Sequence, residues 1–404
     1  MRQPAYIWLA LAAVVGAGIA LRSVHMTDVT SRSPDERFYT LYASQTADSG
    51  LLAYRKLFSD YDSSPVAWPF PAPTRFGFAF LSAGVMKVTG IRDARAGAAV
   101  SCVCSCLSLV LVAWMGLRFF NHWVALAGTA FMASCFGELG TARRAWQDST
   151  FGFFGLLLIW LTCEITRAPR RAGLYLAFFA AGTYSILIKE SSLLSYGLCL
   201  VWILVLAAIR ERSLRLSVLV VTGGVASAAI SLLLWSALAG SQHLALSVLR
   251  HELAFAAGPY AHVNYSGPWY QFFYLLWLVG PSTAAMAAVG AFVTSSEREW
   301  PAARVLLLIT SAFVLFASFV PDFQQLRIMS PANGAYSLLA GLGLCRLVSM
   351  ARAWLGNPAR LAPAIAATYV LASGVGDYTT FTSVVVRSGM EDLAVKGIRN
   401  AMAR

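Results

Sequence analysis

Long apolar runs recur along the whole chain, and they constrain the fold more than any other feature. Each is about 17 to 25 residues long, the length that an α-helix needs to cross a bilayer. The composition agrees, because 58% of the residues are hydrophobic and only 12% are charged. We therefore expect an all-α, polytopic integral membrane protein with about eleven transmembrane helices. The predicted spans are residues 5–24, 93–119, 121–139, 147–166, 171–188, 191–209, 215–239, 268–293, 302–320, 331–350 and 361–380.

Nothing in the chain predicts a second domain. The first apolar run could mimic a signal peptide, but it lacks a small-x-small cleavage site, so we expect an uncleaved first helix. No internal repeat and no appended soluble domain is visible. We expect one transmembrane domain over residues 1–404, with a long loop at 25–92 and a short tail at 381–404.

Arginines are concentrated in alternate short connections between the predicted helices. The positive-inside rule places these connections, and the N-terminus, in the cytoplasm. The 25–92 loop and the 381–404 tail then face the other side of what we expect to be a bacterial inner or plasma membrane. The net charge of +12 is accounted for by orientation and anionic lipid, so the expected partners are membrane lipids, not nucleic acid. The arginines concerned are Arg167, Arg170, Arg171, Arg210, Arg212, Arg215, Arg298, Arg304, Arg346, Arg352 and Arg360.

The loop after the first span contains an adjacent acid pair and two apolar-periodic segments. Asp35 and Glu36 lie just outside the membrane, where unused carboxylates are expensive to hold near low dielectric. Residues 36–60 and 74–90 have the spacing of amphipathic helices and are separated by a Pro-rich break. We expect both segments to lie on the membrane surface.

Five short motifs follow one another in a characteristic order over about the first 350 residues. They are Pro34–Tyr39 (PDERFY), Trp68–Arg75 (WPFPAPTR), Ala142–Asp148 (ARRAWQD), Leu187–Glu190 (LIKE) and Gln325–Pro331 (QLRIMSP). In order and spacing they resemble the GT-C superfamily of membrane glycosyltransferases. The resemblance is strongest to the branch of the protein O-mannosyltransferases and the aminoarabinose (lipid A) transferases. The fifth motif departs from the family, which often has Tyr where this chain has Ile.

The resemblance implies a reaction. In such enzymes a sugar is carried on a polyprenyl phosphate and is transferred, with inversion, to an acceptor hydroxyl on the non-cytoplasmic side. The chain would thus be a hexosyl or pentosyl transferase. Its partners would be a polyprenyl-phosphate sugar and an acceptor lipid, glycan or protein.

Inverting transfer needs a base for the acceptor hydroxyl, and a carboxylate is the usual base at an oxocarbenium-like centre. We expect Asp35 to be that base. The alternative is that Asp35 is the N-cap of the following helix, since Pro-Asp before an apolar periodic stretch is a cap signature. Glu36 is expected to orient the neighbours of Asp35 or to accept a hydrogen bond from the sugar. Its alternative is a solvated acid in the first helical turn.

The leaving phosphate needs cations. Lys189, Arg75 and Arg327 are the candidates, and Arg suits phosphate because its fork donates two parallel hydrogen bonds. The alternatives are lipid headgroup contacts, or for Lys189 a pair with Glu190. Asp148, at the start of a predicted helix, could hold an acceptor or a positioning arginine such as Arg143. Its alternative is a plain acid at a helix N-terminus. The residues expected to position substrate are Arg37, Tyr39, Arg143, Asp148 and His262.

No cofactor is predicted firmly. The 240–267 segment contains three His and a Glu, which leaves a divalent metal open, but their spacing matches no compact zinc pattern. Two other classes of function stay open. One is a transporter or flippase of lipid-linked or polar substrates, which would predict inverted repeats and mid-membrane charges. The other is a surface-polysaccharide polymerase or ligase.

Overall fold

Helices make up the regular structure of the protein. The computed structural model describes residues 5–24, 33–256, 258, 262, 265–292, 300–320, 324–355 and 362–387. No strand occurs among these residues, so the predicted all-α class is confirmed. Residues 25–32, which begin the predicted loop, and 388–404, most of the predicted tail, lie outside the described ranges.

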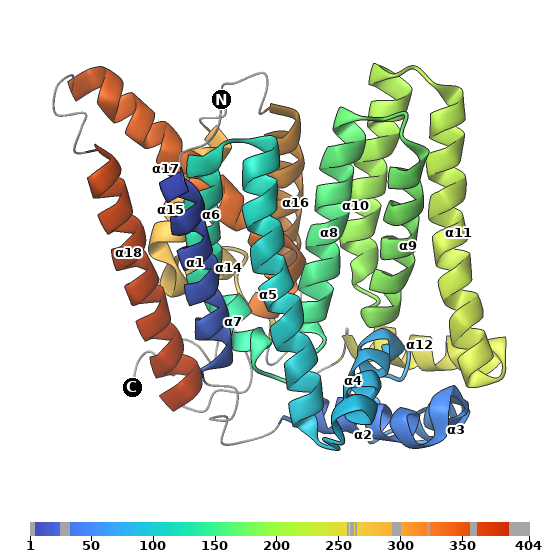
Figure 1. Ribbon diagram of the computed structural model, residues 1–404. Coiled ribbons are helices and arrows are strands. Elements are labelled where there is room, and N and C mark those ends of the chain that lie inside the picture. Colours follow the sequence, from blue (N-terminus) through green and yellow to red (C-terminus); the bar gives the residue numbers. More distant parts are fainter. Residues whose placement is uncertain are drawn as a thin grey trace.

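Most predicted spans coincide with long helices that run side by side through a bundle (Figure 1). Within the described residues, seven helical stretches are long and apolar enough to cross a membrane. They are α1 (Ala5–Ser23), α5 (Ala94–Phe119), α8 (Asp148–Arg167), α10 (Ser192–Val205) with η2 (Leu206–Arg210), α11 (Leu214–Ala239), α16 (Trp300–Phe319), and η3 (Leu326–Ala332) with α17 (Asn333–Leu355).

Two predicted spans are bent pairs of helices. α6 (His122–Ser134) and α7 (Phe136–Ala142) meet at 55°, and α14 (Gln271–Val279) and α15 (Pro281–Phe292) meet at 116°. If each pair is one span, the described residues hold up to nine. The second break has a clear cause, because proline disfavours helical backbone in the residue before it and lacks an N–H donor.

The predicted count of eleven is not confirmed. α9 (Ala172–Ile188) is apolar but has only 17 residues. α18 (Ala362–Phe381) runs along the bundle but is not among the candidate spans. Its sequence carries Ser, Thr and an acid, Asp377, in the half that follows the apolar start, and this lowers its hydropathy.

Shorter helices lie across one end of the bundle. α2 (Pro34–Ser49) and α3 (Ala53–Asp62) occupy the first predicted surface segment, and Gly50, with φ +68°, separates them through the short η1 (Gly50–Leu52). α4 (Phe76–Thr89) follows the Pro-rich break. α12 (Gln242–Ala256), which the sequence did not predict as a helix, lies next to them (Figure 1).

Small residues bring the long helices close together. A Cβ on Gly116 of α5 would lie 2.4 Å from the Cα atom of Ala125 on α6. Likewise, a Cβ on Gly343 of α17 would lie 2.0 Å from the carbonyl oxygen of Met286 on α15. Close backbone approach of this kind is how helices associate where lipid removes the hydrophobic drive.

A buried polar chain ties four helices together near the end that holds α2. Arg22 Nε donates to Ser105 Oγ at 2.8 Å, and Ser105 Oγ donates to Glu138 at 2.8 Å. Asn333 Nδ2 donates to the other oxygen of Glu138 at 3.0 Å. These hydrogen bonds fix α7 and the start of α17 against α1 and α5.

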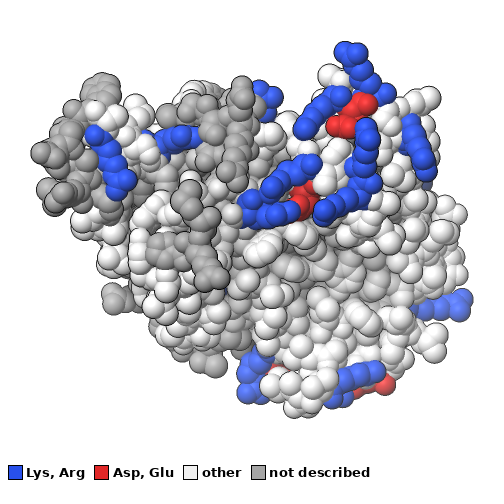
Figure 2. Space-filling view, turned by 45° about the horizontal axis from the view of Figure 1, so that its top comes forward, with Lys and Arg blue, Asp and Glu red and all other residues white. Residues whose placement is uncertain are grey.

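Basic residues gather at the opposite end of the bundle from α2, α3 and α12 (Figure 2). There Arg118 pairs with Glu164 at 2.7 Å, Arg167 donates to the carbonyl of Arg118, and Arg210 donates to the carbonyl of Thr166. We call this the arginine-rich end. Of the predicted arginines, Arg298 and Arg360 lie outside the described residues. Which side of the membrane this end faces stays a prediction.

Candidate active site

Asp35 stands in the first turn of α2, but it does not cap that helix. Ser33 is the N-cap: its hydroxyl accepts from the backbone N–H of Glu36, and the Glu36 carboxylate accepts from the backbone N–H of Ser33. This reciprocal capping box satisfies both donors. The side chain of Asp35 is therefore not used by the helix start, and its Oδ2 lies 3.3 Å from Arg327 Nη1.

Glu36 points the other way, into the protein. It is 0% exposed, so it is not the solvated acid that the sequence left open. Arg144 donates to it from Nε at 3.0 Å and Nη2 at 2.8 Å, and the backbone N–H of Ala145 donates at 3.0 Å. A bidentate pair of this kind has defined geometry. Glu36 thus fixes the start of α2 to the turn between α7 and α8.

Lys189 pairs with Asp148, not with its neighbour Glu190. Its Nζ lies 2.7 Å from Asp148 Oδ1 and 5.2 Å from the centre of the Phe151 ring. Asp148 is the first residue of α8, and Lys189 follows the last residue of α9. Burial lowers the pKa of Lys189, and Arg327 and Arg75 lower it further, against the attraction of Asp148.

Arg75 is held by three groups. Its Nε donates to Glu190 at 3.0 Å, its Nη1 to the Tyr39 hydroxyl at 3.2 Å, and its Nη2 to Glu252. The Thr74 hydroxyl bonds to both carboxylates. The described side chains therefore already engage each of the three nitrogens of Arg75.

Glu190 and Glu252 both contact Arg75, and their pKa values are shifted in opposite directions. Burial raises the pKa of Glu252 to about 8, and the nearby charge of Glu190 raises it as well, against the pull of Arg75. Although burial opposes it, Arg75 together with the Thr74 hydrogen bond keeps the pKa of Glu190 below its usual range. Near neutral pH, Glu252 is thus the protonated member of the pair.

Glu252 lies on α12, and the neighbouring His251 gives this helix a second contact with the segment between α2 and α4. The His251 ring stacks on Trp68 with 3.8 Å between ring centres and 12° between planes, and its Nε2 lies 3.2 Å from Asp62. Sequence reasoning missed the roles of Glu190 and Glu252. A signal for α12 existed: Gly240, at φ +79°, ends α11, and the Ser241 hydroxyl accepts from the N–H of Leu244, as an N-cap does.

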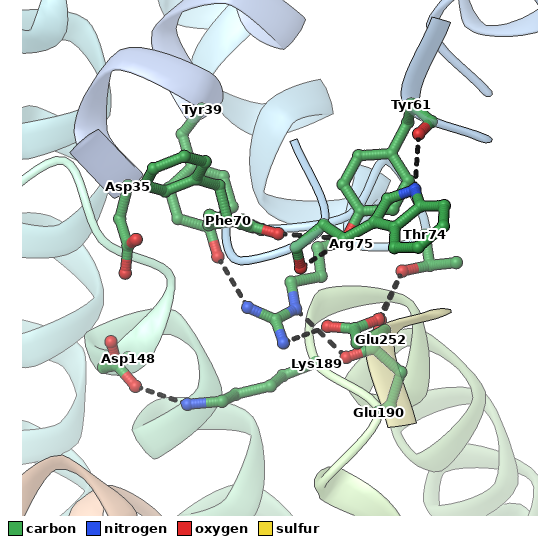
Figure 3. A network of polar contacts seen from close by, with 12 residues as sticks. Asp35, Tyr39, Tyr61, Phe70, Thr74, Arg75, Asp148, Lys189, Glu190 and Glu252 are labelled. Carbon is green, nitrogen blue, oxygen red and sulfur yellow. Dashed lines mark hydrogen bonds and ion pairs between the residues drawn. The ribbon is translucent and has the colours of Figure 1, made fainter. Parts of the chain in front are cut away.

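Figure 3 shows how these groups face one another. The carboxylates of Asp35 and Asp148 lie on one side, Lys189 reaches across to Asp148, and Arg75 lies above Lys189 against the Glu190–Glu252 pair. We call the set of Asp35, Asp148, Lys189, Arg75, Arg327, Glu190 and Glu252 the polar cluster. It joins α2, α8, α12, η3, the segment before α4 and the α9–α10 turn, at the end opposite the arginine-rich end.

Solved structures share this architecture. ArnT from Cupriavidus metallidurans bound to undecaprenyl phosphate matches with a TM-score of 0.56 and 16% identity, over 99% of this chain and 75% of that one. The archaeal oligosaccharyltransferase AglB from Archaeoglobus fulgidus, in complex with an inhibitory peptide and a dolichol-phosphate, matches with a TM-score of 0.54 and 11% identity, over 96% of this chain. The chain has the GT-C fold.

The GT-C resemblance read from the motifs is thus confirmed at the level of the fold. No protein-family model matches the sequence, and no curated protein matches it either. The chain corresponds to only 56% of the AglB chain. At these identities the likeness establishes architecture, and activity is a matter for proposal.

The five predicted positioning residues have different surroundings. Arg37 and His262 are exposed. Arg143 is buried and lies over the ring of Phe381, 5.3 Å from its centre, while Asp148 pairs with Lys189. Tyr39 and Asp148 do belong with the cluster, since one contacts Arg75 and the other Lys189.

The described part of the chain offers no ready set of metal ligands. No group of three or more His, Cys, Asp or Glu side chains within the described ranges could hold a metal ion. One AglB structure with this fold is a complex with Zn and sulfate. The divalent metal that the sequence left open therefore has no assigned ligands among the residues that the structure describes.

Proposed function

We propose that this chain is an inverting glycosyltransferase that moves a sugar from a polyprenyl-phosphate donor to an acceptor hydroxyl on the non-cytoplasmic face of the membrane. The acceptor is a lipid, a glycan or a protein. The observation that carries the proposal is Asp35, which is not used by the helix start and lies within a cluster of cations. Structures with the same fold contain undecaprenyl phosphate or dolichol-phosphate, which supports a lipid-linked donor.

In the proposed reaction, Asp35 is the general base. The acceptor oxygen attacks the anomeric carbon, its proton passes to the Asp35 carboxylate, and the bond between the anomeric carbon and the phosphate oxygen breaks. The electron pair of that bond leaves on the polyprenyl phosphate. Attack from the face opposite the phosphate inverts the anomeric centre.

The leaving phosphate gains negative charge, so we assign it to Lys189 and Arg327. Lys189 pairs with Asp148 and Arg327 pairs with Asp35, and each cation is less than a fifth exposed. Arg75, the third predicted cation, uses its three nitrogens on Glu190, Glu252 and Tyr39. This geometry supports a role for Arg75 in holding the loop before α4. Contact with the donor phosphate is then a secondary role of Arg75.

Glu36, predicted to be catalytic with Asp35, is assigned the positioning role. Glu36 bonds to Arg144 and to the N–H of Ala145, and Asp148 follows Ala145 by three residues. These bonds therefore fix the first turn of α2 relative to Asp148. We therefore assign different roles to the two acids of the motif. Asp35 faces the polar cluster, and Glu36 fixes the position of Asp35.

The test is a transfer assay with purified protein in lipid vesicles, a panel of radiolabelled polyprenyl-phosphate sugars, and a membrane extract as acceptor. We expect label to move from one donor to a product that no longer carries the polyprenyl chain. Asp35→Asn protein, prepared in parallel, is the control for contaminating enzymes. Movement of intact donor across the vesicle membrane without transfer would favour a flippase instead. Assembly of repeat units into long polymer would favour a polymerase.

A further inference from the structure

We propose that the protein binds one anionic glycerophospholipid in a cavity at the arginine-rich end, with an acyl chain inside and the headgroup at Arg352. The cavity lies between α1, α6, α17 and α18 and has a volume of about 360 Å³. That lies within the range of about 300–1,000 Å³ that is usual for small-molecule sites. The polar cluster lies at the other end of the bundle, so this is a separate site.

The walls of the cavity are built from small and aliphatic side chains. Alanines on three helices provide the space, because none has side-chain atoms beyond Cβ. Longer aliphatic side chains complete the surface, and none of the described residues that line it is acidic. An apolar chain is the occupant that such walls favour, since any polar group placed there would lose its hydrogen bonds to water. The alanines are Ala10, Ala127, Ala130, Ala366 and Ala367.

The rim of the cavity differs from its walls. Arg352 lies there near the end of α17, it is exposed, and no ion pair joins it to any residue in the described ranges. Trp123, at the start of α6, is also exposed at the rim. Trp and Arg mark the depth of the headgroups in a bilayer. Arg352 is thus a cation at the depth of the headgroups, next to an apolar cavity, and this arrangement complements a lipid with a negatively charged headgroup.

The depth of the cavity favours a phospholipid over the proposed donor. The lining residues of α1 and α18 belong to the early parts of those helices, and those of α17 to its last turns, so the cavity opens at the arginine-rich end. The phosphate of the proposed donor binds at the polar cluster, which is at the opposite end of the bundle from this cavity. The phosphate of a phospholipid in the near leaflet lies beside Arg352.

The experiment uses full-length protein in vesicles of equal parts phosphatidylcholine and phosphatidylglycerol. After gentle extraction, native mass spectrometry counts the lipids that remain bound. We expect one phosphatidylglycerol to be retained in preference to phosphatidylcholine. Arg352→Gln should reduce that preference about fivefold, since one cation near an anionic surface contributes about that factor. Arg170→Gln, another exposed arginine at the same end, is the matched control and should leave it unchanged.

Filling the cavity tests the walls independently of charge. Ala367→Trp and Ala10→Trp replace residues that line the cavity without being fully buried, so the variants should fold, with melting temperatures near that of the wild type. Both should lose the retained lipid. Equal retention of the two phospholipids, retention that survives both tryptophans, or a polyprenyl lipid in the wild-type spectrum would each overturn the proposal. The outcome is independent of whether sugar transfer is detected.

Discussion

At the scale of single residues, Ser33 and Asp35 have separate roles: Ser33 caps α2, and Asp35 is the proposed base. Asp35→Asn should lower turnover by about a hundredfold or more, because the amide cannot take the acceptor proton. Since Ser33 makes the cap, even Asp35→Ala should keep the melting temperature near that of the wild type. Ser33→Ala is the matched control, expected to cost about 1 kcal/mol of stability. Transfer by Asp35→Asn at near the wild-type rate would remove Asp35 as the base.

The three predicted cations should separate in binding experiments. Lys189→Ala and Arg327→Ala should weaken donor binding by about ten- to a hundredfold, as expected when a charge-assisted contact of roughly 1.5–3 kcal/mol is lost. Arg75→Ala should instead lower the melting temperature, because it leaves Glu190 and Glu252 buried against each other without their counter-ion. Titration with a polyprenyl-phosphate analogue, alongside thermal unfolding, distinguishes them. A reversed pattern would make Arg75 the donor ligand.

Residue identity alone predicted much of the cluster but not its pairing. Asp35, Lys189, Arg75 and Arg327 were all singled out from motifs, and the fold brings them near one another. The partner of Lys189 was not predictable from neighbours in sequence. Its backbone is extended, with φ −158° and ψ 130°, so consecutive side chains point apart. Lys189 therefore meets Asp148, and Glu190 meets Arg75.

At the scale of elements, α12 should respond to pH. Burial and Glu190 raise the pKa of Glu252 to about 8, so the folded state keeps a proton that the unfolded state releases near its ordinary value of about 4.3. The contribution of this group to stability is therefore largest at low pH and declines as pH rises towards about 8. Hydrogen exchange of α12 should accelerate between pH 6 and pH 9, values on either side of that pKa.

Glu252→Gln is the variant that tests this assignment, because its amide stays neutral throughout. Its exchange rates, corrected for the intrinsic effect of pH, should be flat over the same range. The His251–Asp62 pair on the same helix is the nearby alternative source of a pH response. A pH response that persists in Glu252→Gln and vanishes in His251→Gln would move the effect to that pair.

Element prediction succeeded where periodicity was long and failed where a local residue intervened. The long spans were recognised because apolar length alone decides them. The predicted 268–293 span is bent, because Pro281 divides it into α14 and α15. α12 was missed because its apolar face packs on surface helices and its polar positions contact the cluster, so its sequence looks like that of a mixed loop.

At the scale of the whole molecule, the two ends differ in charge and are expected to face different compartments. A cysteine at Ser49, exposed at the end of α2, should react with a membrane-impermeant maleimide in intact cells. A cysteine at Ser213, between α10 and α11 at the arginine-rich end, should react only after the membrane is opened. The native protein controls for its seven thiols. The opposite labelling pattern would place the polar cluster in the cytoplasm.

If Asp35 is the base, as proposed, its contact with Arg327 has a consequence for kinetics. While it persists, the base is neutralised by its own counter-ion, so an acceptor that arrives first meets a carboxylate already engaged. A donor phosphate that recruits Arg327 releases Asp35 at the moment when there is a sugar to transfer. In the proposed mechanism the pair would impose a compulsory order of binding, donor before acceptor, and would keep the donor-free enzyme from activating water.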